Sequence, residues 1–287
     1  MKPAAHVLML LCLLAAAGPH AARAQDRQQP FYIEIADVTE PGQYYFEAIS
    51  EFDVLRTDAR PAVRQNSAYF TISYGVFPNA EVSVFFPVIS IFNERTSVPR
   101  NATGFGDVGY TFKYNFLRER EGSRRPALAV SLLVEAPTGD DERGLGYGLT
   151  NYTVNGILQK TLSEGRQQTG RGETVARLNA GVSFAGVTTD EGPDFRTRGL
   201  VFTGGGSIVR RFTPRLSLGA ELRGARSRNK ELGRGLLLGQ VGGNYAFNDR
   251  VTFDFGVLGG RFPAAPRLGA QLGLSVDLDT RLSERQE

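Results

Sequence analysis

The stretch DVGYTFKYNF, residues 107–116, alternates strictly between two kinds of side chain. Every second residue is apolar or aromatic: Val108, Tyr110, Phe112, Tyr114 and Phe116. The residues between them are polar or glycine: Asp107, Gly109, Thr111, Lys113 and Asn115. Successive side chains of a β-strand point to opposite faces, whereas a helix would scatter both kinds around its circumference. The alternation therefore predicts a strand with one apolar face and one polar face.

The same alternation recurs along most of the chain and predicts an all-β protein with about 12 strands. The other predicted strands cover residues 44–54, 68–76, 81–88, 128–136, 151–160, 177–184, 200–209, 216–225, 237–247, 251–257 and 268–277. Most are close to the roughly 9–11 residues that cross a bilayer at a tilt. Lipid satisfies no backbone hydrogen bonds, so strands can span a membrane only as a closed barrel. We therefore expect an antiparallel up-and-down transmembrane β-barrel, with its strands at about residues 42–277.

The connections between the predicted strands alternate between short and long. Tight turns are expected at residues 78–79, 213–214 and 248–249. Longer polar loops are expected near residues 55–66, 91–104, 137–147, 188–198 and 226–234. If the N-terminus is periplasmic, all three tight turns are periplasmic and the long loops lie outside, as in bacterial outer-membrane barrels. Four aromatic residues beside the predicted periplasmic turns suggest an interfacial girdle: Phe77, Phe116, Phe212 and Phe247.

The N-terminal residues have the features of a cleaved secretory signal peptide. Lys2 provides a positive start, residues 7–17 are apolar, and Ala22-Arg23-Ala24 matches a cleavage site. We therefore expect residues 1–24 to be a signal peptide and residues 25–287 to form the barrel. The protein would then be exported to the bacterial outer membrane.

The expected mature chain excludes several chemistries. Both histidines and the only cysteine lie within residues 1–24, so a Ser–His or Cys nucleophile and His or Cys metal sites are excluded. Carboxylate chemistry remains open, but Glu47 and Glu51 are better explained as solvated lumen groups. The acidic residues 140–142 lack the ligand spacing of a calcium loop. We expect no enzyme, no cofactor and no metal, and the near-equal count of basic and acidic residues gives no reason to expect a nucleic-acid partner.

Charged residues on the polar faces of the strands are the candidate functional residues. A charge facing lipid at the midplane costs about 2–4 kcal/mol for Arg or Lys, so these residues should line the lumen. The candidates are Glu47, Glu51, Asp107, Lys113, Glu135, Arg177, Glu221, Arg223 and Asp254. Two roles compete: a plug, in which Lys113 and Arg177 pair with acids, or a lining that sets the field for solutes. A barrel of this size favours a narrow, partly blocked lumen.

Three stretches resemble the bacterial outer-membrane family named for the MetA-pathway of phenol degradation. Residues 74–87, YGVFPNAEVSVFFP, are similar to a hairpin of that family. Residues 104–107, GFGD, with Lys113-Tyr114 resemble its next strand, and residues 135–139, EAPTG, with the glycines that follow resemble its loop. The resemblance implies an outer-membrane barrel that passes hydrophobic or aromatic compounds. It supplies no catalytic residue.

Two functions remain open from the sequence. The first is a passive channel for small hydrophobic or aromatic solutes, with outer-membrane lipid around it. The second is a non-transport structural or surface-interaction barrel whose loops 91–104 and 188–198 meet partners. A soluble β-sandwich would also alternate, but its strands are usually shorter. The sequence does not predict the solute or the oligomeric state.

Overall fold

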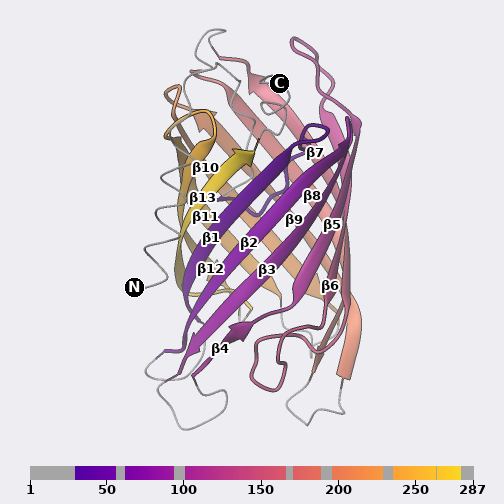
Figure 1. Cartoon of the computed structure of the whole chain (residues 1–287), viewed down its shortest axis with the longest axis vertical. Helices are drawn as coiled ribbons and strands as arrows, with labels where there is room; N and C mark the ends of the chain where they lie inside the picture. The colour runs from indigo at the N-terminus through magenta and orange to yellow at the C-terminus, as the bar shows by residue number, and fades with distance from the viewer. Residues whose placement is uncertain are drawn as a thin grey trace, which may run out of the picture.

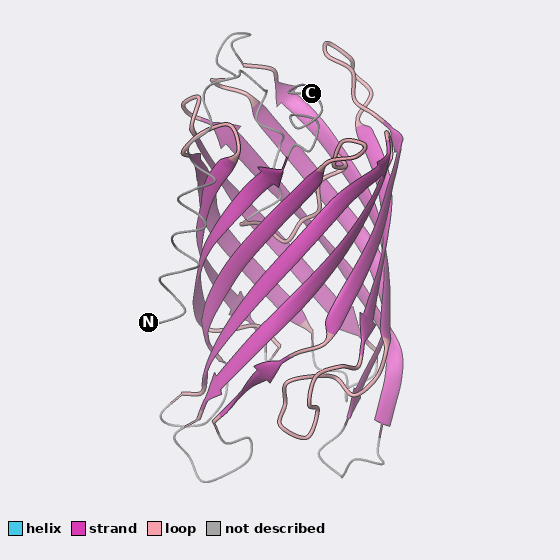
Figure 2. Ribbon diagram, viewed as in Figure 1, coloured by secondary structure: helices cyan, strands magenta, loops and turns pink. Residues whose placement is uncertain are grey.

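The computed structural model describes residues 30–55, 62–93, 101–165, 171–188, 196–228, 235–262 and 264–278. The strands run diagonally around one cylinder (Figure 1). The described residues form no helix; strands joined by loops and turns make up the chain (Figure 2). No helix that is long and apolar enough to cross a membrane occurs in these residues. The expected signal peptide, residues 1–24, lies outside them and stays a prediction.

Thirteen strands build the wall. They are β1 (Tyr44–Val54), β2 (Arg64–Phe77), β3 (Ala80–Phe92), β4 (Ala102–Phe105), β5 (Val108–Leu117), β6 (Ala127–Ala136), β7 (Asn151–Ser163), β8 (Thr174–Thr188), β9 (Arg196–Arg211), β10 (Leu216–Ser227), β11 (Leu236–Ala246), β12 (Val251–Arg261) and β13 (Leu268–Leu278). Every predicted strand is confirmed. Several are longer than predicted, because polar residues at their ends still pair with neighbouring strands.

The strands close on themselves in an up-and-down order. Strands that follow one another in sequence pair antiparallel, except that β4 and β5 both pair with β3. β1 also pairs with β13 over eleven residue pairs, from Tyr44↔Leu278 to Val54↔Leu268. The closed antiparallel barrel is therefore confirmed. One end of the cylinder carries the connections at 78–79, 212–215 and 247–250, and we call it the turn end. The opposite end carries residues 137–150, and we call it the loop end. Residues 94–100 of the predicted loop 91–104 and residues 189–195 of the predicted loop 188–198 lie outside the described residues.

The two faces of each strand behave as the alternation predicts. On β5, Phe112 is 52% exposed and its neighbour Lys113 is 8% exposed. The predicted girdle residues Phe77, Phe116, Phe212 and Phe247 are also exposed. Exposed large apolar side chains lie all around the cylinder, and the polar alternates are buried inside it. This pattern is the reverse of a soluble sandwich, in which the apolar face would be buried.

The short strand β4 was not predicted and lies in the expected loop 91–104. β3 pairs first with β5, ending at Phe85↔Gly109, and then with β4, beginning at Val88↔Phe105. The register shifts by one residue between these pairs, as at a β-bulge. The backbone N–H of Gly106 still donates to the Pro87 carbonyl at 2.9 Å. β4 and β5 therefore act as one interrupted strand, so the barrel wall has the equivalent of twelve strands.

Candidate functional site

A segment that the sequence analysis did not assign, residues 30–43, crosses the interior of the barrel. It appears in indigo inside the cylinder in Figure 1 and bonds to strands on opposite sides of it. Its side chains Phe31, Ile33 and Ala36 are buried. A Cβ atom added to Gly219 or Gly205 would lie within 3.0 Å of Phe31 or Ile33 respectively. The inner-face glycines thus leave room for the apolar side chains of this N-terminal segment.

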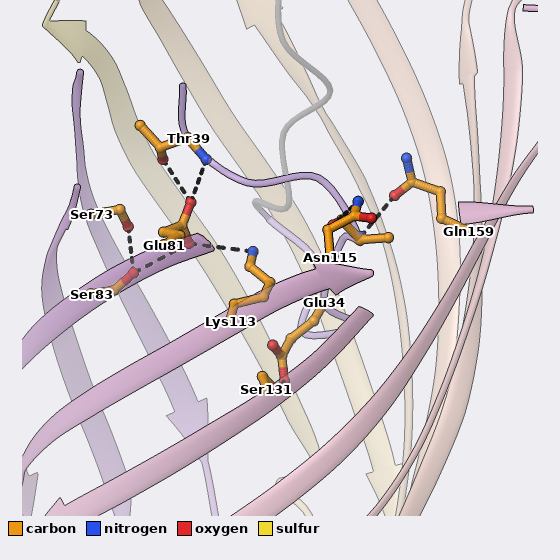
Figure 3. Close-up of polar contacts among 10 residues, drawn as sticks. Glu34, Thr39, Ser73, Glu81, Ser83, Lys113, Asn115, Ser131 and Gln159 are labelled. Carbon is orange, nitrogen blue, oxygen red and sulfur yellow. Dashed lines mark hydrogen bonds and ion pairs between the residues drawn. The ribbon is translucent and has the colours of Figure 1, made fainter. Parts of the chain in front are cut away.

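A buried ion pair anchors the C-terminal part of the N-terminal segment (Figure 3). Thr39 donates to Glu81 Oε2 twice, from its backbone N–H at 2.7 Å and from its hydroxyl at 2.6 Å. Lys113 Nζ lies 3.3 Å from Glu81 Oε1, and both side chains are almost fully buried. Buried charges are stable only when they are paired and hydrogen-bonded, and Glu81 satisfies both conditions here. The three residues therefore tie the N-terminal segment to β3 and β5.

Carboxamides bind the middle of the N-terminal segment. Asn115 donates from Nδ2 to the Ala36 carbonyl at 2.7 Å, and the Ala36 N–H donates to Gln159 Oε1 at 3.2 Å. Ser131 and Asn155 both donate to Glu34 Oε1 at 2.9 Å. An extended chain outside any sheet presents both N–H and C=O groups, and a carboxamide can serve either. Side-chain amides on β5 and β7 therefore make the hydrogen bonds to the segment's backbone that a neighbouring strand would make in a sheet.

The N-terminal part of the segment meets the other side of the barrel. The Ile33 N–H donates to Glu221 Oε2 at 2.7 Å, and Gln240 donates to the Pro30 carbonyl at 2.6 Å. Tyr32 donates its hydroxyl to Glu51, and the Arg223 guanidinium lies 3.6 Å from the centre of the Tyr32 ring. Strands β1, β10 and β11 thus hold one end of the segment, while β3, β5 and β7 hold the rest. The segment spans the lumen.

A cavity of about 450 Å³ remains between the N-terminal segment and the wall. Phe31, Tyr32 and Asp37 line it from the segment. Tyr45 and Asp277 line it near the turn end, and Glu51 and Glu135 line it toward the loop end. Its walls mix aromatic rings with polar and charged groups, so the lining is more polar than that of a usual small-molecule site. The N-terminal segment therefore narrows the lumen without filling it.

Asp107 organises the loop end of the lumen. The Gly139 N–H donates to Asp107 Oδ1 at 2.8 Å, and the Tyr147 N–H donates to Asp107 Oδ2 at 2.7 Å. Leu145, between these two anchors, is buried in a cluster with Ile91 and Ala102. The bulge at Gly106–Asp107 places the carboxylate where it can hold residues 139–147. Asp107 thus has a structural role at the rim, away from the cavity.

The structure places the nine candidate residues inside the barrel but in different settings. Five line the cavity: Glu47, Glu51, Lys113, Glu135 and Arg223. The other four, Asp107, Arg177, Glu221 and Asp254, are buried outside the cavity lining. Glu221 bonds the N-terminal segment, and Asp254 accepts from the Ser275 hydroxyl at 2.6 Å. Lys113 pairs with an acid, Glu81, that the candidate set did not contain.

Sequence reasoning missed Glu81 and the residues that bind the N-terminal segment. Glu81 shares the inward-facing alternation of β3 with Ser83 and Phe85, so the pattern could have included it. The inward amides Asn115 and Gln159 also follow the alternation, but nothing in a strand pattern shows that a chain segment bonds them. Among the residues that the structure describes, no three His, Cys, Asp or Glu side chains gather as a metal site.

A family model described as "Putative MetA-pathway of phenol degradation" matches residues 31–278. Among solved structures, the COG4313 outer membrane channel from Pseudomonas putida F1 matches with a TM-score of 0.67 and 12% identity, over 88% of this chain and 100% of that chain. The NanC porin matches with a TM-score of 0.51 and 10% identity, over 82% and 100%. The transport unit of the autotransporter AIDA-I from Escherichia coli gives 0.51 and 8%, over 88% and 94%. These likenesses show the outer-membrane barrel fold; no curated protein matches the chain.

Proposed function

The chain belongs to the MetA-pathway of phenol degradation family, and on that premise we propose that it is a passive outer-membrane channel for small hydrophobic or aromatic solutes. The exposed apolar belt would face outer-membrane lipid. The Pseudomonas putida protein of similar fold is described as an outer membrane channel. The same role for this chain requires a route through its lumen.

The cavity beside the N-terminal segment supports such a route. Its lining follows β1 from Tyr45 near the turn end to Glu51 toward the loop end, and β2 from Ser73 to Tyr69. It therefore runs along the wall beside the segment, over residues 45–51 of β1 and residues 69–73 of β2. On this side of the lumen a solute would pass the contacts of Tyr32 with Glu51 and of Thr39 with Glu81.

The lining suits small aromatic molecules. Tyr45, Tyr69 and Phe85 present rings to the cavity from three adjacent strands, and Ile49 and Leu133 add aliphatic surface. Aromatic rings pack favourably in edge or offset geometry against other rings. The polar groups between them keep the route wet, so a solute need not be wholly apolar. The expected conductance is small, because the segment occupies much of the cross-section.

Recordings on the purified, refolded protein in planar bilayers test this function. We expect small, steady single-channel currents, and faster entry of small aromatic solutes into proteoliposomes than into empty vesicles. Absence of both current and solute flux would overturn the proposal. Gel migration before and after heating shows whether the barrel has folded, so a negative result can be attributed to a closed lumen.

A structural or surface-interaction barrel is the second candidate, and the buried Glu81–Lys113 pair favours it. A segment fixed by an ion pair and several hydrogen bonds on opposite strands could close the lumen permanently. Deleting residues 30–40 separates the two functions. A channel would show current before the deletion and more current after it, whereas a structural barrel would show current only after it.

A further inference from the structure

Carboxylates outnumber cations along the cavity. On the wall they are Glu47, Glu51, Glu81, Glu135 and Asp277, and on the N-terminal segment they are Glu34 and Asp37. Among the described residues that line the cavity, the cations are Lys113 and Arg223. The acids extend from the turn end toward the loop end, so a solute meets them along the whole route. A lining with one dominant sign of charge sets the ion preference of a pore.

Both lining cations already face a partner of their own. Lys113 is paired with Glu81 at 3.3 Å, and Arg223 lies over the Tyr32 ring at 3.6 Å. Glu34, in contrast, accepts hydrogen bonds from the neutral donors Ser131 and Asn155. Asp37 accepts a hydrogen bond from Gln159 at 2.7 Å. The described cavity lining thus holds seven carboxyl groups and two cations, an excess of acidic groups.

One more buried acid lies on β1 toward the loop end, outside the cavity lining. Asp53 follows Glu51 at the next inward-facing position of β1 and is only 9% exposed. Its Oδ1 atom is buried and accepts no hydrogen bond in the described structure. Aromatic rings in the cavity lining, such as Tyr69, add a surface that attracts cations.

We infer that the lumen selects for cations, and that among small aromatic solutes it takes those with an ammonium group and rejects those with a carboxylate. This inference rests on the proposed channel function. A carboxylate in the cavity would lose water and stand among several like charges, whereas an ammonium group would replace its water with carboxylate oxygens. Uncharged aromatic solutes should pass at a rate between those of the ammonium and carboxylate solutes.

Two measurements on the intact refolded protein test the inference. The first is the reversal potential under a potassium chloride gradient, which we expect to show greater permeability to potassium than to chloride. The second is flux into proteoliposomes of three solutes with one ring, namely benzylamine, benzyl alcohol and benzoate. We expect flux to fall in that order at neutral pH, where the first is a cation and the last is an anion.

Charge-removing variants localise the effect. Glu47→Gln removes a lining carboxylate and keeps the shape, so it should lower the ratio of potassium to chloride permeability by on the order of threefold. Asp249→Asn is the matched control, because Asp249 is exposed in the connection between β11 and β12 at the turn end. It should leave the ratio nearly unchanged.

The outcomes are distinguishable. Current with equal or greater chloride permeability would overturn the inference and leave the channel function standing. Benzoate flux equal to benzylamine flux would overturn it as well. Absence of any current or flux would overturn the channel function itself and the inference with it. The wild-type measurements decide the sign of the preference, so the test does not depend on whether a variant folds.

Discussion

The backbone N–H of Ile33 donates to the Glu221 carboxylate at 2.7 Å, across 188 positions of sequence. This bond ties the N-terminal segment to β10. Replacing Glu221 by Ala should loosen that end of the segment and raise the single-channel conductance, since less of the lumen would be held closed. Glu221→Gln keeps an acceptor oxygen and should give a smaller rise. Equal currents from wild type and Glu221→Ala would show that other contacts hold the segment.

Glu81→Gln should destabilise the barrel markedly. The substitution keeps an acceptor for Thr39 but leaves the buried Lys113 without its counter-charge. Removing one partner of a buried pair costs about 3–5 kcal/mol. The loss can be measured by urea unfolding of the detergent-solubilised protein. Asp140→Asn provides the control, because the Asp140–Arg143 pair is about half exposed and should contribute under about 1 kcal/mol.

Gly109→Ala should disturb the cavity lining. Gly109 lies opposite Phe85 in the pairing of β5 with β3, and an added Cβ would collide with the Phe85 ring. The ring must then turn into the lumen, so we expect lower conductance together with some loss of stability. Gly156→Ala is the matched change, since its added Cβ would meet Ala180 at an ordinary contact distance of 3.5 Å. Equal conductance in both variants would contradict the placement of Phe85.

Val257→Arg should weaken the folded state in lipid by about 2–4 kcal/mol, the cost of a cation on the lipid face near the midplane. Val257 is 52% exposed, lies in the middle of β12, and pairs with the equally exposed Val241 on β11. Unfolding in lipid vesicles measures the change, and Val257→Leu is the apolar control. A neutral effect of the arginine would place this residue outside the hydrocarbon belt.

The strands of the wall could be predicted from the sequence because the face to which each side chain points depends only on its position within its own strand. The alternation at residues 107–116 fixes which side chains of β5 face lipid, and the structure buries Lys113 and exposes Phe112 accordingly. The same rule placed the inward charges, including Glu51 and Arg223. The bulge at Gly106 could not be predicted, since it depends on a hydrogen bond to Pro87 in a neighbouring strand.

The N-terminal segment could not be predicted because its partners are distant in sequence. Residues 31–38, FYIEIADV, carry a partly alternating pattern like that of a strand, yet they join no sheet. Their apolar side chains pack where glycines such as Gly205 and Gly219 leave space, and their backbone bonds to amides such as Gln159. Alternation identifies an inward face, but it does not identify what occupies the interior.

The pairing of β1 with β13 has a consequence for how the molecule folds. These strands are separated by more than 200 residues, and contacts of such large sequence separation form slowly because the intervening chain must first be ordered. The N-terminal segment is covalently attached to β1, so it stays beside that strand until β1 pairs with β13. We therefore expect enclosure of the segment to accompany closure of the wall, since its partners lie on strands from both sides of the barrel. A folding helper that kept β1 apart from β13 would delay both together.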